Sequence, residues 1–196
     1  MNIIKFENQH IPQVVEIHQL ELEVGVLNYF GNQFLKRMYS SLLKDNWGYV
    51  VISDDGETVV GFVFATKKDT SLLKCLSLNS VIIFLKNILF DFAKAKAFFI
   101  AFRKLYLSSN EFSFDLEGRR IELSQFAVKE GFKGMGLGSK LVESLEIQAK
   151  NEGYSLVFTR TNNIRLVKHY KKSRAAKLLL KVPLGTYESH LLEWSI

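Results

Sequence analysis

The sequence predicts a mixed α/β domain, because segments with strand and helix patterns alternate along one chain of 196 residues. Three stretches carry the prediction. Phe34 to Leu43 has an apolar stripe at helical spacing, and Trp47 to Thr66 holds two β-rich runs around an Asp-Asp-Gly turn. Phe132 to Leu141 sets three glycines before an amphipathic helix. A chain of this length is most simply one domain, residues 1–196.

The first third of the chain predicts a strand, two helices and a hairpin. Ile3 to Phe6 alternates weakly and precedes a helix that begins near Pro12. The second helix begins just after Gly31, where its apolar stripe starts. The hairpin turns at Gly56. These elements predict a layer of helices against a sheet.

Leu72 to Leu107 differs in character, being rich in Phe, Leu, Ile and Lys. Its spacing predicts two amphipathic helices, the first with Val81, Phe84 and Leu85 on one apolar face. We expect these helices to pack on the sheet; the alternatives are a substrate lid and a patch that lies on a membrane with its lysines towards lipid phosphates. The uncharged stretch from Cys75 to Leu85 is too short for a spanning helix, which needs about 18 to 20 residues.

The second half of the chain predicts further strands and helices in alternation. A glycine-rich turn follows the first of these strands, and asparagines open the second helix. The segments are a strand at Ile121 to Val128, a helix at Ser139 to Asn151, a strand at Ser155 to Thr161, a helix opened by Asn162 and Asn163, and strands at Ala176 to Val182 and Ser189 to Ile196, separated by Pro183 and Gly185.

The glycine-rich turn predicts a bound phosphate. A strand, a glycine turn and a helix start together present unpaired N–H groups and the positive end of the helix dipole. A P-loop requires lysine where Leu137 stands. A dinucleotide fingerprint requires G-x-G-x-x-G, whereas Gly134, Gly136 and Gly138 give G-x-G-x-G. Both of these nucleotide-binding families are therefore disfavoured.

Ile121 to Lys172 resembles the acetyl-CoA-binding half of the GNAT superfamily of N-acetyltransferases. The family's loop has Arg or Gln, two residues, Gly, one residue, then Gly or Ala. Lys133, Gly136 and Gly138 match this pattern, with Lys in place of Arg or Gln. The resemblance implies a twisted, mainly antiparallel central sheet with helices on both faces. The 72–107 segment is a helical insertion that the minimal family fold lacks.

A second family signal is an Asn followed seven residues later by Tyr on a short helix. Asn163 and Tyr170 match it. The chain departs from the family just afterwards, because Ser-Arg-Ala-Ala at residues 173–176 replaces the usual Gly-Phe turn.

The resemblance implies a set of cofactor contacts. The coenzyme A diphosphate would lie on the loop amides, where a Cβ would block its approach. Pantetheine would lie like an extra strand against the strand before the loop. The implied cofactor-binding residues are Phe126, Val128, Lys133, Gly134, Met135, Gly136, Leu137, Gly138, Ser139 and Asn163.

The implied reaction moves acetyl from acetyl-CoA directly to a primary amine. The amine must lose a proton, and a carboxylate can take it. We favour Glu122; a surface strand glutamate is the alternative role, and Glu117, Asp115 and Glu111 are the other candidates. The resemblance makes Tyr170 the general acid for the thiolate, against a purely structural buried tyrosine.

The acceptor amine is expected to belong to a small molecule such as an amino sugar or polyamine. A protein N-terminus or lysine is the alternative, as is a non-catalytic CoA-binding sensor or scaffold. The net charge of +6 favours anionic partners. The basic run from Arg165 to Lys181 is either a solvated face or an attractor for the CoA 3′-phosphate. No specific nucleic-acid motif accompanies it.

The remaining expectations concern compartment, metals and assembly. A single cysteine, Cys75, excludes an intrachain disulfide and fits a reducing compartment. The N-terminus lacks a secretory signal pattern, so a cytoplasmic protein is expected. His10, His18 and His190 have no metal-ligand spacing with one another or with Cys75, so we expect no metal site. A homodimer is compatible with the sequence.

Overall fold

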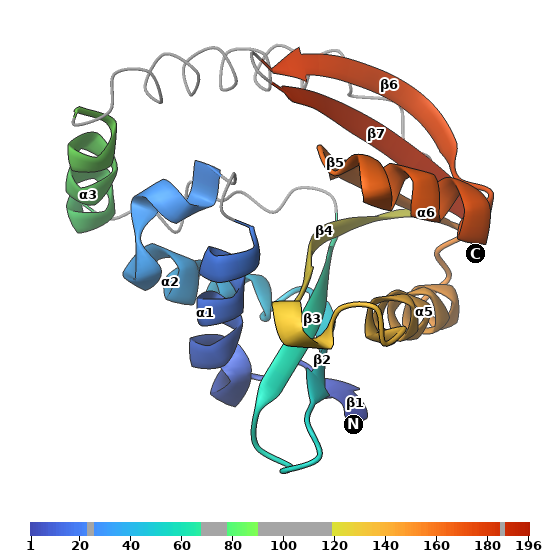
Figure 1. Cartoon of the computed structure of the whole chain (residues 1–196), viewed down its shortest axis with the longest axis horizontal. Helices are drawn as coiled ribbons and strands as arrows, with labels where there is room; N and C mark the ends of the chain where they lie inside the picture. Colours follow the sequence, from blue (N-terminus) through green and yellow to red (C-terminus); the bar gives the residue numbers. More distant parts are fainter. Residues whose placement is uncertain (23–25, 68–77, 90–118, 185–186) are drawn as a thin grey trace.

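The protein folds around one seven-stranded sheet (Figure 1). The computed structural model describes residues 1–22, 26–67, 78–89, 119–184 and 187–196. The strand order is β1-β2-β3-β4-β5-β7-β6, and every neighbouring pair is antiparallel except β4 with β5. The predicted mixed α/β class with a mainly antiparallel sheet is therefore confirmed. The strands are β1 (Asn2–Lys5), β2 (Trp47–Ile52), β3 (Val59–Thr66), β4 (Arg120–Val128), β5 (Leu156–Thr161), β6 (Lys177–Leu184) and β7 (Tyr187–Ser195).

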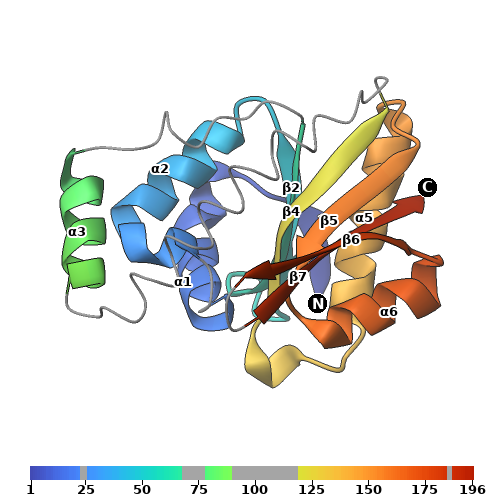
Figure 2. The same ribbon diagram turned by 90° about the horizontal axis from the view of Figure 1, so that it is seen from above.

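Helices cover both faces of the sheet, as expected (Figures 1 and 2). α1 (Ile11–Glu21) and α2 (Asn32–Leu42) lie on one face, whereas α5 (Leu137–Asn151) and α6 (Ile164–Arg174) lie on the other. Each pair encloses its own apolar core against the sheet. Short 3₁₀ turns, η1 (Asn8–His10), η2 (Val26–Phe30) and η4 (Glu130–Phe132), join the elements.

The stripe predicted for α2 is the face that it buries. Its five buried apolar side chains are each at most 3% exposed, and burying one stabilises the fold by roughly 1.5–3 kcal/mol. Gly31 lies just before the helix with φ of 80°, a conformation that favours glycine. The buried side chains are Phe34, Leu35, Met38, Tyr39 and Leu42.

The predicted hairpin is confirmed, and a side chain holds its turn. The Asp55 carboxylate accepts hydrogen bonds from the N–H groups of Glu57 and Thr58 at 2.9 Å and from the Thr58 hydroxyl at 2.6 Å. Hydrogen bonds from Ser53 and Thr58 hold the pKa of Asp55 well below its usual range. Gly56 turns the chain with φ of 79°.

The last two strands differ from the prediction at Pro183. We expected this proline to separate the strands, but β6 continues through it to Leu184 and pairs it with Glu188 of β7. β6 is the edge strand of the sheet, where one side of the strand has no ladder. Proline is tolerated there because no inner ladder needs its missing N–H.

The first insertion helix does not pack on the sheet, so that prediction was wrong for α3 (Leu78–Leu89). In both views α3 lies beyond α1 and α2, which already cover this sheet face (Figures 1 and 2). The Phe84 ring stacks on Phe30 of η2 at 4.4 Å, whereas Val81 and Leu85 of the same predicted face are exposed. The second predicted helix lies outside the described residues.

The two central strands part midway along their length (Figure 1). The parallel ladder of β4 with β5 joins Arg120–Leu123 to Leu156–Thr159 and ends there. The Thr159 hydroxyl donates to the Leu123 carbonyl at 2.8 Å, at the end of the ladder. β4 continues to Val128 beside β3 alone, after a bulge in which Ser124 has no partner residue on β3. Among the described residues, no strand pairs with that side of β4 beyond Leu123.

Candidate functional site

The open side of β4 exposes specific main-chain groups. The Lys129 N–H donates to the Val60 carbonyl at 2.9 Å, which fixes the alternation of hydrogen-bonded pairs along β3 and β4. By that alternation the N–H and C=O of Ala127 point towards β3, and those of Phe126 and Val128 point away from it. The two predicted pantetheine-binding residues thus direct main-chain groups that no described strand pairs with into the gap between β4 and β5.

The glycine turn leaves the start of α5 uncapped. Gly134 and Gly136 have φ of 82° and 76°, left-handed values that an L side chain rarely adopts. Gly136 occupies the N-cap position and has no side chain with which to accept the first N–H groups of α5. These amides, from Leu137 onward, remain available to an anion. The helix begins at Leu137, two residues before the predicted start.

Gly138 lies in close contact with an aromatic ring of β4. A Cβ on this residue would lie 2.9 Å from Cζ of Phe126. The Phe126 ring therefore packs directly on the first turn of α5. This contact places the open segment of β4 beside the uncapped amides, which is the arrangement that a phosphate with an extended arm needs.

Lys133 is held by two carboxylates. Its Nζ lies 2.6 Å from Glu21 at the end of α1 and also pairs with Glu130 of η4. The hydrogen bonds that Lys133 donates to Glu130 and Glu21 raise the pKa of Lys133. Glu21 also accepts the Glu130 N–H at 2.9 Å. These contacts tether the turn to α1, while Met135 at its tip is 55% exposed.

Tyr170 is buried on the inner side of α6. Its ring stacks on Trp194 of β7 with centroids 5.0 Å apart, and burial raises its pKa. The hydroxyl therefore keeps its proton at physiological pH. Asn163 caps the same helix, because its Oδ1 accepts the Arg165 N–H at 2.9 Å and the Leu166 N–H at 3.4 Å. The structure thus gives Asn163 a capping role; its cofactor contact stays a prediction.

Glu122 lies on the other face of the sheet. Its neighbours Ile121 and Leu123 point into the core under α5, so Glu122 points towards the side of α1 and α2. Burial raises its pKa, against the opposing effects of Arg160 and a hydrogen bond from Thr66. The other three candidate bases lie outside the described residues. Glu122 and Tyr170 therefore lie on opposite sides of the sheet.

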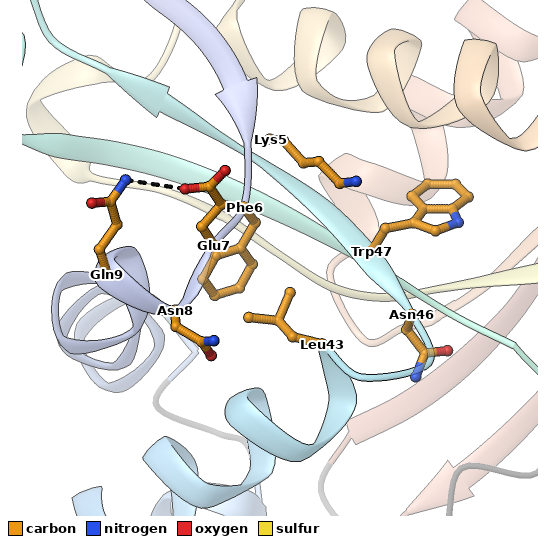
Figure 3. Close-up of a pocket in the computed structure, with 8 residues that line it drawn as sticks. All are labelled: Lys5, Phe6, Glu7, Asn8, Gln9, Leu43, Asn46 and Trp47. Atoms are coloured by element: carbon orange, nitrogen blue, oxygen red, sulfur yellow. Dashed lines mark hydrogen bonds between the residues drawn. The ribbon is translucent and has the colours of Figure 1, made fainter.

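Other features of the described chain do not add a site. The described residues contain no cluster of His, Cys, Asp and Glu that could hold a metal ion, and no helix among them is long and apolar enough to cross a membrane. Figure 3 shows a cavity of about 460 Å³ at η1, the end of α2 and the start of β2, away from the elements that carry the predicted site. Its lining is Lys5, Phe6, Glu7, Asn8, Gln9, Leu43, Asn46 and Trp47.

Comparison with known proteins decides the family. The family model described as Acetyltransferase (GNAT) family matches residues 11–175. The chain belongs to the GNAT acetyltransferases. It is a transferase by that membership. A search of curated protein sequences found no match.

Solved structures share the GNAT fold with this chain. Aminoglycoside 6′-acetyltransferase type Ii is 13% identical with a TM-score of 0.61, and covers 100% of this chain and 97% of its own. The ribosomal-protein-S18-alanine N-acetyltransferase from Escherichia coli is 11% identical with a TM-score of 0.60, at 100% and 93%. Ard1 from Thermoplasma volcanium is 16% identical with a TM-score of 0.59, at 100% and 97%. At these identities the likeness concerns the fold alone.

The end of α6 keeps a left-handed turn without the glycine usual in GNAT proteins. Ala175 adopts φ of 50° and ψ of 33°, the one positive φ of a non-glycine residue in the described chain. The Ala176 N–H donates to the Tyr170 carbonyl at 3.2 Å. The departure at residues 173–176 therefore changes the residue and preserves the turn.

The sequence did not predict a polar cluster around Tyr170 in this GNAT domain, formed by Glu146, Arg174 and Trp194. Glu146 of α5 pairs with Arg174 of α6 and accepts the Trp194 indole N–H at 2.7 Å. The Arg174 guanidinium lies 6.0 Å from the centre of the Tyr170 ring. Residues 28 and 48 positions apart are joined here, and no local pattern in the sequence marks such a contact.

Proposed function

We propose that this GNAT acetyltransferase uses acetyl-CoA and transfers its acetyl group directly to a primary amine. One observation carries the proposal: the open main-chain groups of Phe126 and Val128 adjoin the uncapped start of α5 through the Phe126–Gly138 contact. An extended pantetheine arm and a diphosphate need those two features side by side. The glycines at 134 and 136 leave room for a phosphate, because a Cβ built there meets no protein atom within 4 Å.

The amide groups between residues 134 and 139 hold the diphosphate in this proposal. The main-chain groups of Phe126 and Val128 hold the arm in the gap between the strands. We assign to the Val128 N–H the role of stabilising the negative charge that develops on the thioester oxygen. Bound there, acetyl-CoA supplies an activated acetyl group. In this proposal Glu122 serves the reaction from one side of the sheet and Tyr170 from the other.

Glu122 acts as the general base. An alkyl ammonium has a pKa of about 10.4, so its deprotonation at pH 7 costs roughly 4.6 kcal/mol before any bond forms. Glu122 accepts this proton directly or through a water before the amine attacks, and the second proton, which the nitrogen loses once the N–C bond has formed, passes to solvent. Since burial raises its pKa, its carboxylate is a stronger base than a solvated one.

Tyr170 acts as the general acid for the leaving thiolate. As the C–S bond breaks, its hydroxyl donates a proton to the thiolate and is reprotonated from solvent. The raised pKa keeps this proton available across the working pH range. Arg174 above the ring and Glu146 beside it hold the tyrosine in place.

The acceptor in our proposal is a small-molecule amine, such as an amino sugar or polyamine. The fold is shared with a structure named for aminoglycosides and with one named for a ribosomal-protein alanine, so a protein N-terminus or lysine is the alternative. The remaining alternative is a protein that binds acetyl-CoA without catalysis. The proposal also includes a cytoplasmic location.

The test is thiol release from acetyl-CoA across a panel of small amines and peptides. We expect one amine class to be turned over, with Tyr170→Phe reducing the rate about 100-fold. The Glu122 carboxylate is the active form, so the rate should fall as the pH drops through its raised pKa, and Glu122→Gln should remove that limb. Thermal stabilisation by acetyl-CoA without turnover of any amine would show a binding protein instead.

A further inference from the structure

α6 carries a basic stripe beside the glycine turn, formed by Arg165, His169 and Lys172. All three side chains are exposed. At about 100° per residue they fall within roughly 60° of one another on the helix surface. Val167 and Tyr170 are buried on the inner side of the helix. Within the part of the chain that the structure describes, no carboxylate forms an ion pair with Arg165 or Lys172.

One contact and one electrostatic effect place the stripe along the glycine turn. His169 Nε2 lies 3.3 Å from the Ser139 hydroxyl in the first turn of α5. Lys133 and, to a smaller extent, Arg165 lower the pKa of Glu130 in η4, so Arg165 lies within electrostatic reach of the other end of the turn. The stripe therefore borders the turn from Glu130 to Ser139, and its cations face the same solvent as the uncapped amides.

The direction of the coenzyme follows from the open strand. If the diphosphate lies on the amides, the pantetheine arm leaves it towards Phe126 and Val128. The 3′-phosphoadenosine must leave the diphosphate by the other end, where Ser139 and His169 meet. This end carries the additional dianionic phosphate. A cluster of cations there has an evident partner.

We propose that Arg165, His169 and Lys172 bind the 3′-phosphate of coenzyme A and make the protein selective for coenzyme A over its 3′-dephospho form. This inference rests on the proposed function and adds a specificity-determining surface to the same site. The 3′-dephospho form keeps the diphosphate and the arm and loses only the groups that the stripe contacts. Its affinity therefore reports on the stripe separately from the amides.

The test is calorimetric titration of the intact protein with coenzyme A and with 3′-dephospho-coenzyme A. For exposed charge contacts, one of them to a guanidinium, we expect about tenfold tighter binding of coenzyme A. Arg165→Gln with Lys172→Gln should abolish this ratio and leave the affinity for the dephospho form unchanged, which also shows that the variant is folded. Raising the salt concentration should shrink the ratio in the wild type.

Lys171→Gln is the matched control. Lys171 is exposed on the same helix and next to Lys172, but it lies roughly 160° around the helix from His169. We expect it to keep the full ratio. Equal wild-type affinity for the two coenzymes, or a ratio that survives the double substitution, overturns the inference and leaves the proposed function standing. Failure of both coenzymes to bind overturns the two together.

Discussion

Ala175 ends α6 in a left-handed conformation, and glycine at this position should stabilise the protein. Its φ is 50° and its ψ is 33°. A residue with a Cβ loses about 1–2 kcal/mol in this conformation relative to its right-handed form. Glycine avoids that strain, but its greater freedom in the unfolded chain offsets about 0.4–1 kcal/mol. The net expectation for Ala175→Gly is a gain of about 0.5–1 kcal/mol.

Thermal and urea unfolding measure this gain. For a chain of this size 1 kcal/mol corresponds to about 2–4 °C, so the melting temperature should rise by about 1–4 °C. Ala176→Gly is the matched control, because it makes the same chemical change at the next residue. Ala176 is buried in the core under α5, so losing its methyl group should lower stability by about 1 kcal/mol. An Ala175→Gly protein that melts at or below the wild-type temperature would refute the reasoning.

Three further predictions concern the glycine turn, the polar cluster around Tyr170 and a buried histidine. Gly136→Ala forces a Cβ into a left-handed residue, so it should lower the stability by about 1 kcal/mol and weaken acetyl-CoA binding. In Gly138→Ala the gain in helix propensity should offset the loss of stability caused by displacing the Phe126 ring. Melting curves with and without acetyl-CoA distinguish the two variants. Glu146→Gln leaves a half-buried guanidinium unpaired and should lower the stability by about 1–3 kcal/mol in urea unfolding, while Glu143→Gln, on the exposed face of the same helix, should change little. Burial lowers the pKa of His18 to about 4, so the folded state favours the neutral imidazole. The resulting contribution to folding stability, about 3 kcal/mol, is fully present above pH 6.5 and is lost as the pH falls to 4. His18→Gln should show a correspondingly shallower loss over the same pH range, and identical pH profiles would contradict the assignment.

The sequence predicts those parts of the fold whose signal is local. The stripe of α2 repeats at helical spacing because one face of the helix is buried, and the glycines at 134 and 136 stand where the backbone adopts left-handed values. The open edge of β4 is different. It depends on a bulge at Ser124 and on where β5 stops pairing, and both are properties of the assembled sheet.

The misplaced features have physical causes of the same kind. The pattern of α3 marks an apolar face but does not specify which element covers it, and on that face Phe84 meets η2 while Val81 stays exposed. Asn163 fits a family motif, yet its carboxamide oxygen is occupied by two helix N–H groups. Glu146 and Trp194 come together only when α5 and β7 are in place. Contacts between distant segments leave no periodic trace in the sequence.

The placement of Glu122 and Tyr170 on opposite sides of the sheet has an evolutionary consequence. The amides, the open strand and the tyrosine all come from residues 120–175, whereas the surface that Glu122 faces is built by the earlier elements of the chain. In the proposed function, mutations in that earlier part would change which amine is admitted while the contacts to the coenzyme stay constant. On that proposal, new acceptor preferences would arise by divergence of the first half of the gene, with the second half under separate selection.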